Sequence, residues 1–157
     1  AHYYTNFTYW TQHCWGVTCV NDMEAMLSYL PISTDNKDQA LADLVRCYER
    51  MMMRSHTNGG YVNLLDECWK MCEKFNVNIV IMYDHVSCKN VGGLHGLFED
   101  QARERGIHLI WIPHDVMDPR TVSRREMREA FNQYMTTVLR EEPLDPTLLD
   151  YEDNLSW

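Results

Sequence analysis

The sequence lacks a long apolar run, a basic stripe and a phosphate-binding glycine motif. Its longest apolar runs, residues 77–83 and 107–112, are far shorter than the roughly 20 residues that cross a bilayer. The 14 Lys and Arg residues are outnumbered by 23 Asp and Glu residues, which gives a formal net charge of −9. Neither GxGxxG nor GxxxxGK is present. We therefore expect a cytoplasmic protein that binds neither nucleic acid nor a membrane surface.

Chain length bounds the domain organisation. The chain has 157 residues, which is enough for one hydrophobic core and short for two. Its first methionine is Met23, so we expect a domain cut from a longer subunit. We predict one α/β domain over residues 1–142 and an acidic C-terminal arm over residues 143–157. Two interpretations of the arm stay open: it packs over its own domain, or it docks on a partner subunit.

The apolar pattern switches between strand and helix periods. Residues 77–83 and 107–112 are typical of strands covered on both faces. The segment between them has helical spacing and Gly106 at its end, which predicts two parallel strands joined by a right-handed crossover. We therefore expect a three-layer α/β/α fold with a small parallel sheet, of Rossmann or flavodoxin-like type. The other predicted elements are a strand at 3–9, a loop at 10–20 and helices at 21–30, 35–53, 61–75 and from Ser123 onward.

Three predicted helices carry an apolar face that we expect to point inward. Ser123 and Glu126 have the spacing of a capping box at the start of the last helix. The inward faces, in chain order, consist of Leu41, Leu44, Val45, Tyr48 and Met52; of Leu64, Leu65, Cys68, Cys72 and Phe75; and of Met127, Ala130, Phe131, Tyr134 and Val138.

Cys88 is the first candidate for chemistry, because it stands where the 77–83 strand passes into a helix. Ligands of open α/β sheets bind at the carboxyl ends of the strands, and a helix N-terminus favours an anion such as a thiolate. The alternative is a small buried hydrophobic residue, the commoner role of a lone cysteine. His85 and Cys88 also have the spacing of half a zinc site, which Cys14 or Cys19 would have to complete.

The remaining thiols and imidazoles favour structural roles. The six cysteines are scattered among predicted helices and strands, which favours a reducing compartment over disulfide bonds. Cys14 with Cys19 are spaced too widely for most metal pairs, and Cys68 with Cys72 lie on one apolar helix face. The other histidines are dispersed and predict no Ser/His/Asp arrangement; they include His56, His95, His108 and His114.

The second half of the chain, read as a unit, resembles a known family. SCK at 87–89, then a helix, GIHLIWIPHD at 106–115 and MDPRTVS at 117–123 follow in the order of the C-terminal domain of the 2-hydroxyacyl-CoA dehydratase and benzoyl-CoA reductase family. The likeness runs from about residue 35 to 142. The residues that match the family's pattern are Asp115, Asp118, Pro119, Arg120 and Ser123, and the pair Cys47 and Tyr48 corresponds to a CY pair of some members.

The resemblance implies an iron–sulfur enzyme acting on coenzyme A thioesters, either by 2-hydroxyacyl-CoA dehydration or by ring reduction of an aryl-CoA. It makes Cys88 a ligand of a 4Fe-4S cluster, with Lys89 beside it to stabilise the thiolate. It implies a second subunit and an ATP-dependent iron–sulfur activator or electron donor as partners. Asp118 and Arg120 are then expected to hold a turn as an ion pair. Two alternatives remain: a noncatalytic docking domain with structural thiols, and a small zinc protein.

Overall fold

The computed structural model describes residues 5–23, 30–51, 54, 56, 59–118 and 120–150. The chain divides into two compact units, residues 1–19 with 78–157, and residues 20–77. Each is described by itself below. No described helix is both long enough and apolar enough to cross a membrane. The predicted boundary between a domain and an arm at residue 142, and the place of the chain in a longer subunit, stay predictions.

The first unit is built on a parallel pair of strands, β1 (Ile79–His85) and β2 (His108–His114). The pairing runs from Ile79 opposite His108 to His85 opposite His114. A helical crossover joins the two strands, made of the short α5 (Lys89–Gly92) and the longer α6 (His95–Arg105). Gly106 ends α6 with a φ of 67°, a left-handed conformation that glycine adopts without strain. The predicted parallel pair and the α/β class are confirmed.

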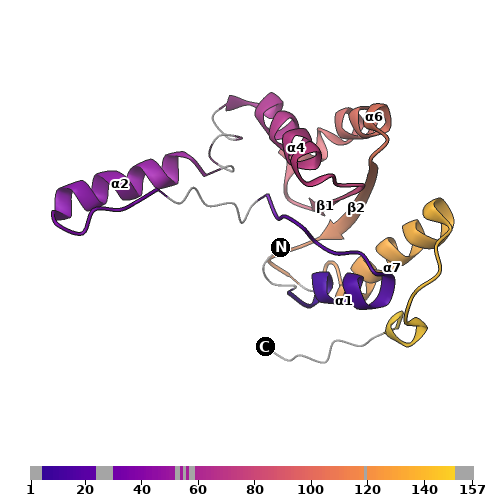
Figure 1. Cartoon of the computed structure of the whole chain (residues 1–157). Helices are drawn as coiled ribbons and strands as arrows, with labels where there is room; N and C mark the ends of the chain where they lie inside the picture. Colours follow the sequence, from indigo (N-terminus) through magenta and orange to yellow (C-terminus); the bar gives the residue numbers. More distant parts are fainter. Residues whose placement is uncertain are drawn as a thin grey trace. The chain divides into compact units, whose positions relative to one another are not determined.

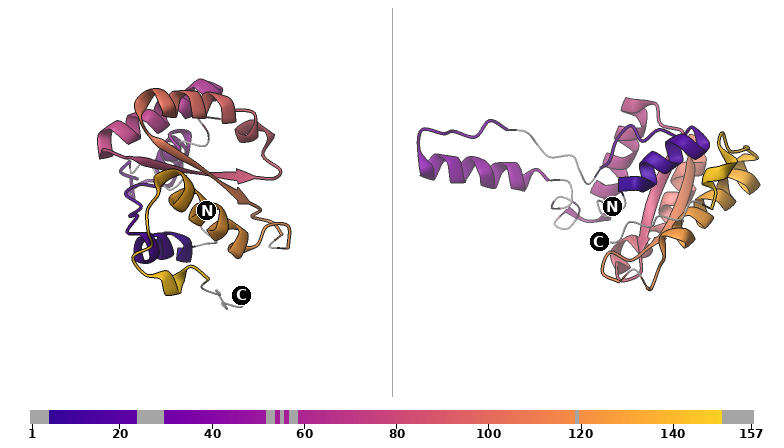
Figure 2. Two further views of the ribbon diagram at one scale, coloured as in Figure 1. Left: turned by 90° about the vertical axis from the view of Figure 1, so that its right-hand side faces the viewer. Right: turned by 90° about the horizontal axis from the view of Figure 1, so that it is seen from below.

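Helices cover both faces of this sheet, as the three-layer prediction required (Figures 1 and 2). On one face α6 packs on β2 and buries Phe98 and Ala102. On the other face lie α7 (Arg124–Tyr134) and α1 (Thr5–Trp15), as Figure 2 shows. The main hydrophobic core fills the space between the sheet and these two helices. Its buried members are Phe7, Trp10, Cys14, Trp15, Ile110, Ile112, Val122, Met127, Phe131 and Met135.

The prediction of a strand at 3–9 and a loop at 10–20 was wrong, because α1 occupies most of that stretch. Its aromatic and β-branched residues favour strands locally. However, Phe7, Trp10, Thr11 and Cys14 recur at helical spacing and are all buried. Phe7 and Trp10 both meet the edge of the Phe131 ring, with centroids 5.9 and 5.7 Å away. Burial of this face against α7 therefore overrides the local propensity.

The last predicted helix is confirmed at its start and corrected at its end. Ser123 accepts from the Glu126 backbone N–H, and the Glu126 carboxylate accepts from the Ser123 backbone N–H, so the predicted capping box is present. After Tyr134 the chain continues as a π-helix over Met135–Leu139. The wider turn of a π-helix shifts later residues around the axis. Val138, predicted to point inward, is therefore exposed.

The described part of the acidic arm, residues 143–150, packs on α1 of its own unit. The Leu144 N–H donates to the Cys14 carbonyl at 2.7 Å, and the Trp10 indole N–H donates to the Leu148 carbonyl at 2.8 Å. A short 3₁₀ turn, Pro146–Leu148, follows Asp145. The side chain of Leu144 is exposed. Residues 151–157 of the predicted arm lie outside the described residues.

The second unit contains two of the predicted helices, α2 (Lys37–Glu49) and α4 (Tyr61–Phe75). Asn36 caps α2 by accepting from the Asp38 N–H at 2.8 Å. The predicted inward face of α2 is exposed: Leu41 is 52% exposed and Tyr48 is 64% exposed. None of the residues of α2 is buried in the described structure. By contrast, α4 buries Leu65, Cys68, Trp69 and Cys72. The predicted 21–30 helix and Met52 fall largely or wholly outside the described residues.

Candidate functional site

The carboxyl end of the sheet carries Cys88, as predicted. The residue stands at the N-cap of α5, and its backbone N–H donates to the His85 carbonyl at 2.8 Å, which closes a tight turn after β1. The Cys88 carbonyl accepts from the Gly92 N–H at 3.1 Å. The thiol is free and partly exposed. Neighbouring Lys89 is exposed. This arrangement presents a partly exposed sulfur at the carboxyl end of β1.

Two histidines lie at the same end, on the face that α1 and α7 cover. The His85 ring lies edge-on to the His114 ring, with centroids 5.8 Å apart. His85 Nδ1 accepts from the Ser87 N–H at 3.1 Å, so in the neutral ring Nε2 carries the proton and can donate it to a hydrogen-bond acceptor. Burial is the main cause that lowers the pKa of His114 to about 4, and the neighbouring His85 adds to the effect. His114 is therefore neutral at physiological pH.

The loop after β2 uses its carboxylates to build turns. Asp115 accepts from the Met117 and Asp118 N–H groups at 2.9 and 3.3 Å, and these bonds hold its pKa below the usual range. Asp118 forms a paired contact with the Arg120 guanidinium, at 2.9 Å to Nε and 2.8 Å to Nη2. The predicted ion pair is therefore confirmed. Pro119 lies outside the described residues.

A second histidine arrangement, on the opposite face, was not predicted. His95, the first residue of α6, lies between Asp84 of β1 and Trp111 of β2. His95 Nε2 is 3.3 Å from Asp84 Oδ1, and the imidazole stacks on the indole with centroids 3.6 Å apart and planes at 21°. The sequence signal was an Asp one residue before the end of β1 and a His at the start of the second helix after it.

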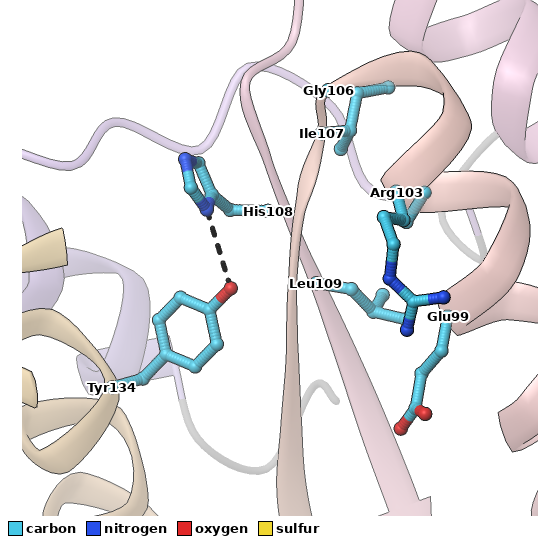
Figure 3. A pocket seen from close by; sticks show the side chains of 8 residues that line it. Glu99, Arg103, Gly106, Ile107, His108, Leu109 and Tyr134 are labelled. Carbon is cyan, nitrogen blue, oxygen red and sulfur yellow. Dashed lines mark hydrogen bonds between the residues drawn. The ribbon is translucent and has the colours of Figure 1, made fainter. Parts of the chain in front are cut away.

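The amino end of β2 carries a cavity instead of a thiol. Figure 3 shows its lining, which comes from α6, β2 and α7. Its volume is about 390 Å³. Tyr134 Oη and His108 Nδ1 share a hydrogen bond of 3.4 Å, and burial raises the pKa of the Tyr134 phenol. The lining residues are Glu99, Ala102, Arg103, Gly106, Ile107, His108, Leu109 and Tyr134.

Comparison with known proteins decides the family. Residues 1–135 match the family model described as 2-hydroxyglutaryl-CoA dehydratase, D-component. The chain belongs to this dehydratase family. No curated protein and no solved structure matches it. The family match confirms the resemblance predicted from the second half of the chain. It also begins earlier than expected, since it includes α1 and the residues before α2.

The described residues fit a cluster of the dehydratase type only in part. A 4Fe-4S cluster is held by four cysteine thiolates, and Cys88 is a cysteine at this end of the sheet that could supply one. No three His, Cys, Asp or Glu side chains come together as metal ligands in the described ranges. The zinc site predicted from His85 and Cys88 with Cys14 or Cys19 is therefore not formed by them. Cys14 is fully buried with a pKa raised to about 11, mainly by burial.

Proposed function

We propose that this chain is part of an iron–sulfur enzyme that dehydrates a 2-hydroxyacyl-CoA thioester, with Cys88 as one ligand of a 4Fe-4S cluster. The observation that carries the proposal is the dehydratase family match over residues 1–135. The position of Cys88 supports it further, because this partly exposed thiol follows a parallel strand directly. The remaining ligands would come from outside the described site.

The chemistry explains why such an enzyme needs a cluster. A 2-hydroxyacyl thioester has no acidic proton at its β carbon, so acid–base catalysis alone cannot expel the α-hydroxyl. A 4Fe-4S cluster, when bound, would supply the one electron at low potential that the thioester needs, and this would acidify the β proton. This chain's own contribution is a thiolate at Cys88. Lys89 follows it in the sequence and is exposed.

The partners follow from the same proposal. The description of the family as a D-component supports a second dehydratase subunit. The single electron requires a donor of low potential, which we propose to be a separate ATP-dependent iron–sulfur activator. The substrate class is an acyl-CoA that carries a 2-hydroxyl group.

Product analysis tests the proposed reaction. The protein is isolated without oxygen, together with any subunits that co-purify. It is then mixed with ATP, a one-electron reductant, the activator and a panel of 2-hydroxyacyl-CoA thioesters. We expect loss of water to give an enoyl-CoA with the unmodified protein and with Cys19→Ser, whose thiol is exposed elsewhere in the chain. Cys88→Ser should give no product.

Two outcomes would contradict the proposal. One is dehydration by Cys88→Ser at the unmodified rate. The other is an absence of dehydration together with the gain of two hydrogen atoms by an aryl-CoA, which would identify ring reduction instead.

A further inference from the structure

The Asp84, His95 and Trp111 side chains lie together, and the proposed role of Cys88 as an iron ligand does not explain why. They come from three different elements, β1, α6 and β2, and meet on the face of the sheet that α6 covers. Asp84 and His95 form an ion pair at 3.3 Å, and the imidazole lies flat on the indole. We call this arrangement the His95 cluster.

A purely structural tie between α6 and the sheet is a poor account of the His95 cluster. The two side chains of the ion pair are 38% and 34% exposed, and ion pairs with this much exposure add little stability. Trp111 Nε1 is buried and makes no hydrogen bond, and His95 Nε2, also buried, has only the 3.3 Å contact with Asp84. Buried polar atoms without such a bond cost stability, and they persist where function requires them.

The position of the His95 cluster points to the chemistry at Cys88. One short helix, α5, separates Cys88 at its N-cap from His95. This helix lies directly against Asp84, since a Cβ atom on Gly92 would lie 3.9 Å from Asp84 Oδ1. Asp84 and Cys88 therefore lie at the same end of β1, the end at which ligands of parallel sheets bind.

We propose that His95 is a catalytic residue of the dehydration, taking the proton that the β carbon of the thioester loses. Asp84 and Trp111 are positioning residues that hold the imidazole. The β C–H bond breaks, its proton goes to Nδ1 of His95, because Nε2 faces Asp84, and its electron pair becomes part of the new Cα=Cβ bond. The α-hydroxyl leaves with the electron pair of its C–O bond and takes a proton from the solvent to become water. This inference rests on the proposed function.

The imidazole of His95 suits this proton transfer better than the nearby carboxylates do. Histidine is the side chain that enzymes use most often to accept protons. A nearby carboxylate stabilises the imidazolium that forms, which is the role Asp84 can take at 3.3 Å. The carboxylates of Asp115 and Asp118 are engaged in their own turns.

Kinetics of matched histidine variants provide the first test. In the assembled enzyme, His95→Gln should lower kcat by about 100-fold or more and leave KM and iron content unchanged. His108→Gln, at the other end of β2, should keep its activity. His95→Ala should regain activity with added imidazole, which a structural role would not produce. An unchanged kcat in His95→Gln, or a loss that imidazole never restores, would overturn the inference.

Chemical footprinting gives a readout that does not depend on turnover. We expect diethyl pyrocarbonate to modify His95, and a bound 2-hydroxyacyl-CoA to slow that modification several-fold without protecting His108. Equal modification of His95 with and without the thioester would contradict the inference. Failure of the proposed function is separate, because it appears as iron content that Cys88→Ser does not change.

Discussion

The two ends of the sheet in the first unit differ in a way that bears on function. The carboxyl end offers a free thiol at Cys88 and a partly exposed Asp84–His95 pair. The amino end offers a cavity of about 390 Å³, in which Tyr134 and His108 share a hydrogen bond. Because a thiol can bind iron and the Tyr134 and His108 side chains already bond to each other, the side-chain chemistry favours the carboxyl end as the reactive one.

The largest expected effect is on the hydrophobic core that supports both ends of the sheet. Phe131 is fully buried between α1 and the sheet and touches the Phe7 and Trp10 rings. Phe131→Ala should therefore lower the free energy of unfolding by about 3–5 kcal/mol. Urea unfolding followed by circular dichroism measures this change. A loss below about 1 kcal/mol would mean that this core does not hold the two ends in place.

Acid should lower the free energy of unfolding through His114, which lies at the carboxyl end of the sheet. His114 in the folded chain takes up its proton only near pH 4, whereas the unfolded chain does so near 6.5. Between these values the unfolded state binds more protons, so stability falls as the pH falls, by about 3 kcal/mol at most. Unfolding measured from pH 7 to 4 should show this slope, and His114→Gln should flatten it. At still lower pH, protonation of Asp115 should also reduce the free energy of unfolding, because its pKa is depressed in the folded chain.

The His114 prediction has a clear failure. An identical pH slope in the unmodified protein and in His114→Gln would place the acid-sensitive group elsewhere.

The smallest expected effect concerns the amino end of the sheet alone. Tyr134→Phe removes the hydrogen bond to His108 and keeps the ring. The free energy of unfolding should fall by about 1 kcal/mol, while iron content and dehydration rate stay as in the unmodified protein. Thermal unfolding and the activity assay check both parts. Loss of activity without loss of fold would move the reactive region to this end.

Local patterns were enough to predict the elements around Cys88. Continuous apolar runs predicted β1 and β2, and the Ser123 and Glu126 spacing predicted the start of α7. Each of these signals spans only a few neighbouring residues. The helix α1 was missed because its character depends on burial against α7, more than a hundred residues away in the sequence. For the same reason the apolar stripe of α2 could not reveal that it is exposed.

The candidate site was predictable one residue at a time. Cys88 stood out because a strand-to-helix junction is a local feature. The His95 cluster was missed, because it depends on the register that places Trp111 beside the start of α6. Sequence spacing carries no record of that register. The turn around Asp118 and Arg120 was anticipated, since both partners lie within the same short segment.

The central claim is that the carboxyl end of the sheet is the reactive end and that Cys88 binds iron there. Its most direct test is the iron, acid-labile sulfide and zinc content per chain of protein purified without oxygen. The account predicts about four iron and four sulfide in the unmodified protein and in Cys19→Ser, and loss of both in Cys88→Ser. Equal iron in all three proteins, no iron in any of them, or zinc without sulfide would contradict it.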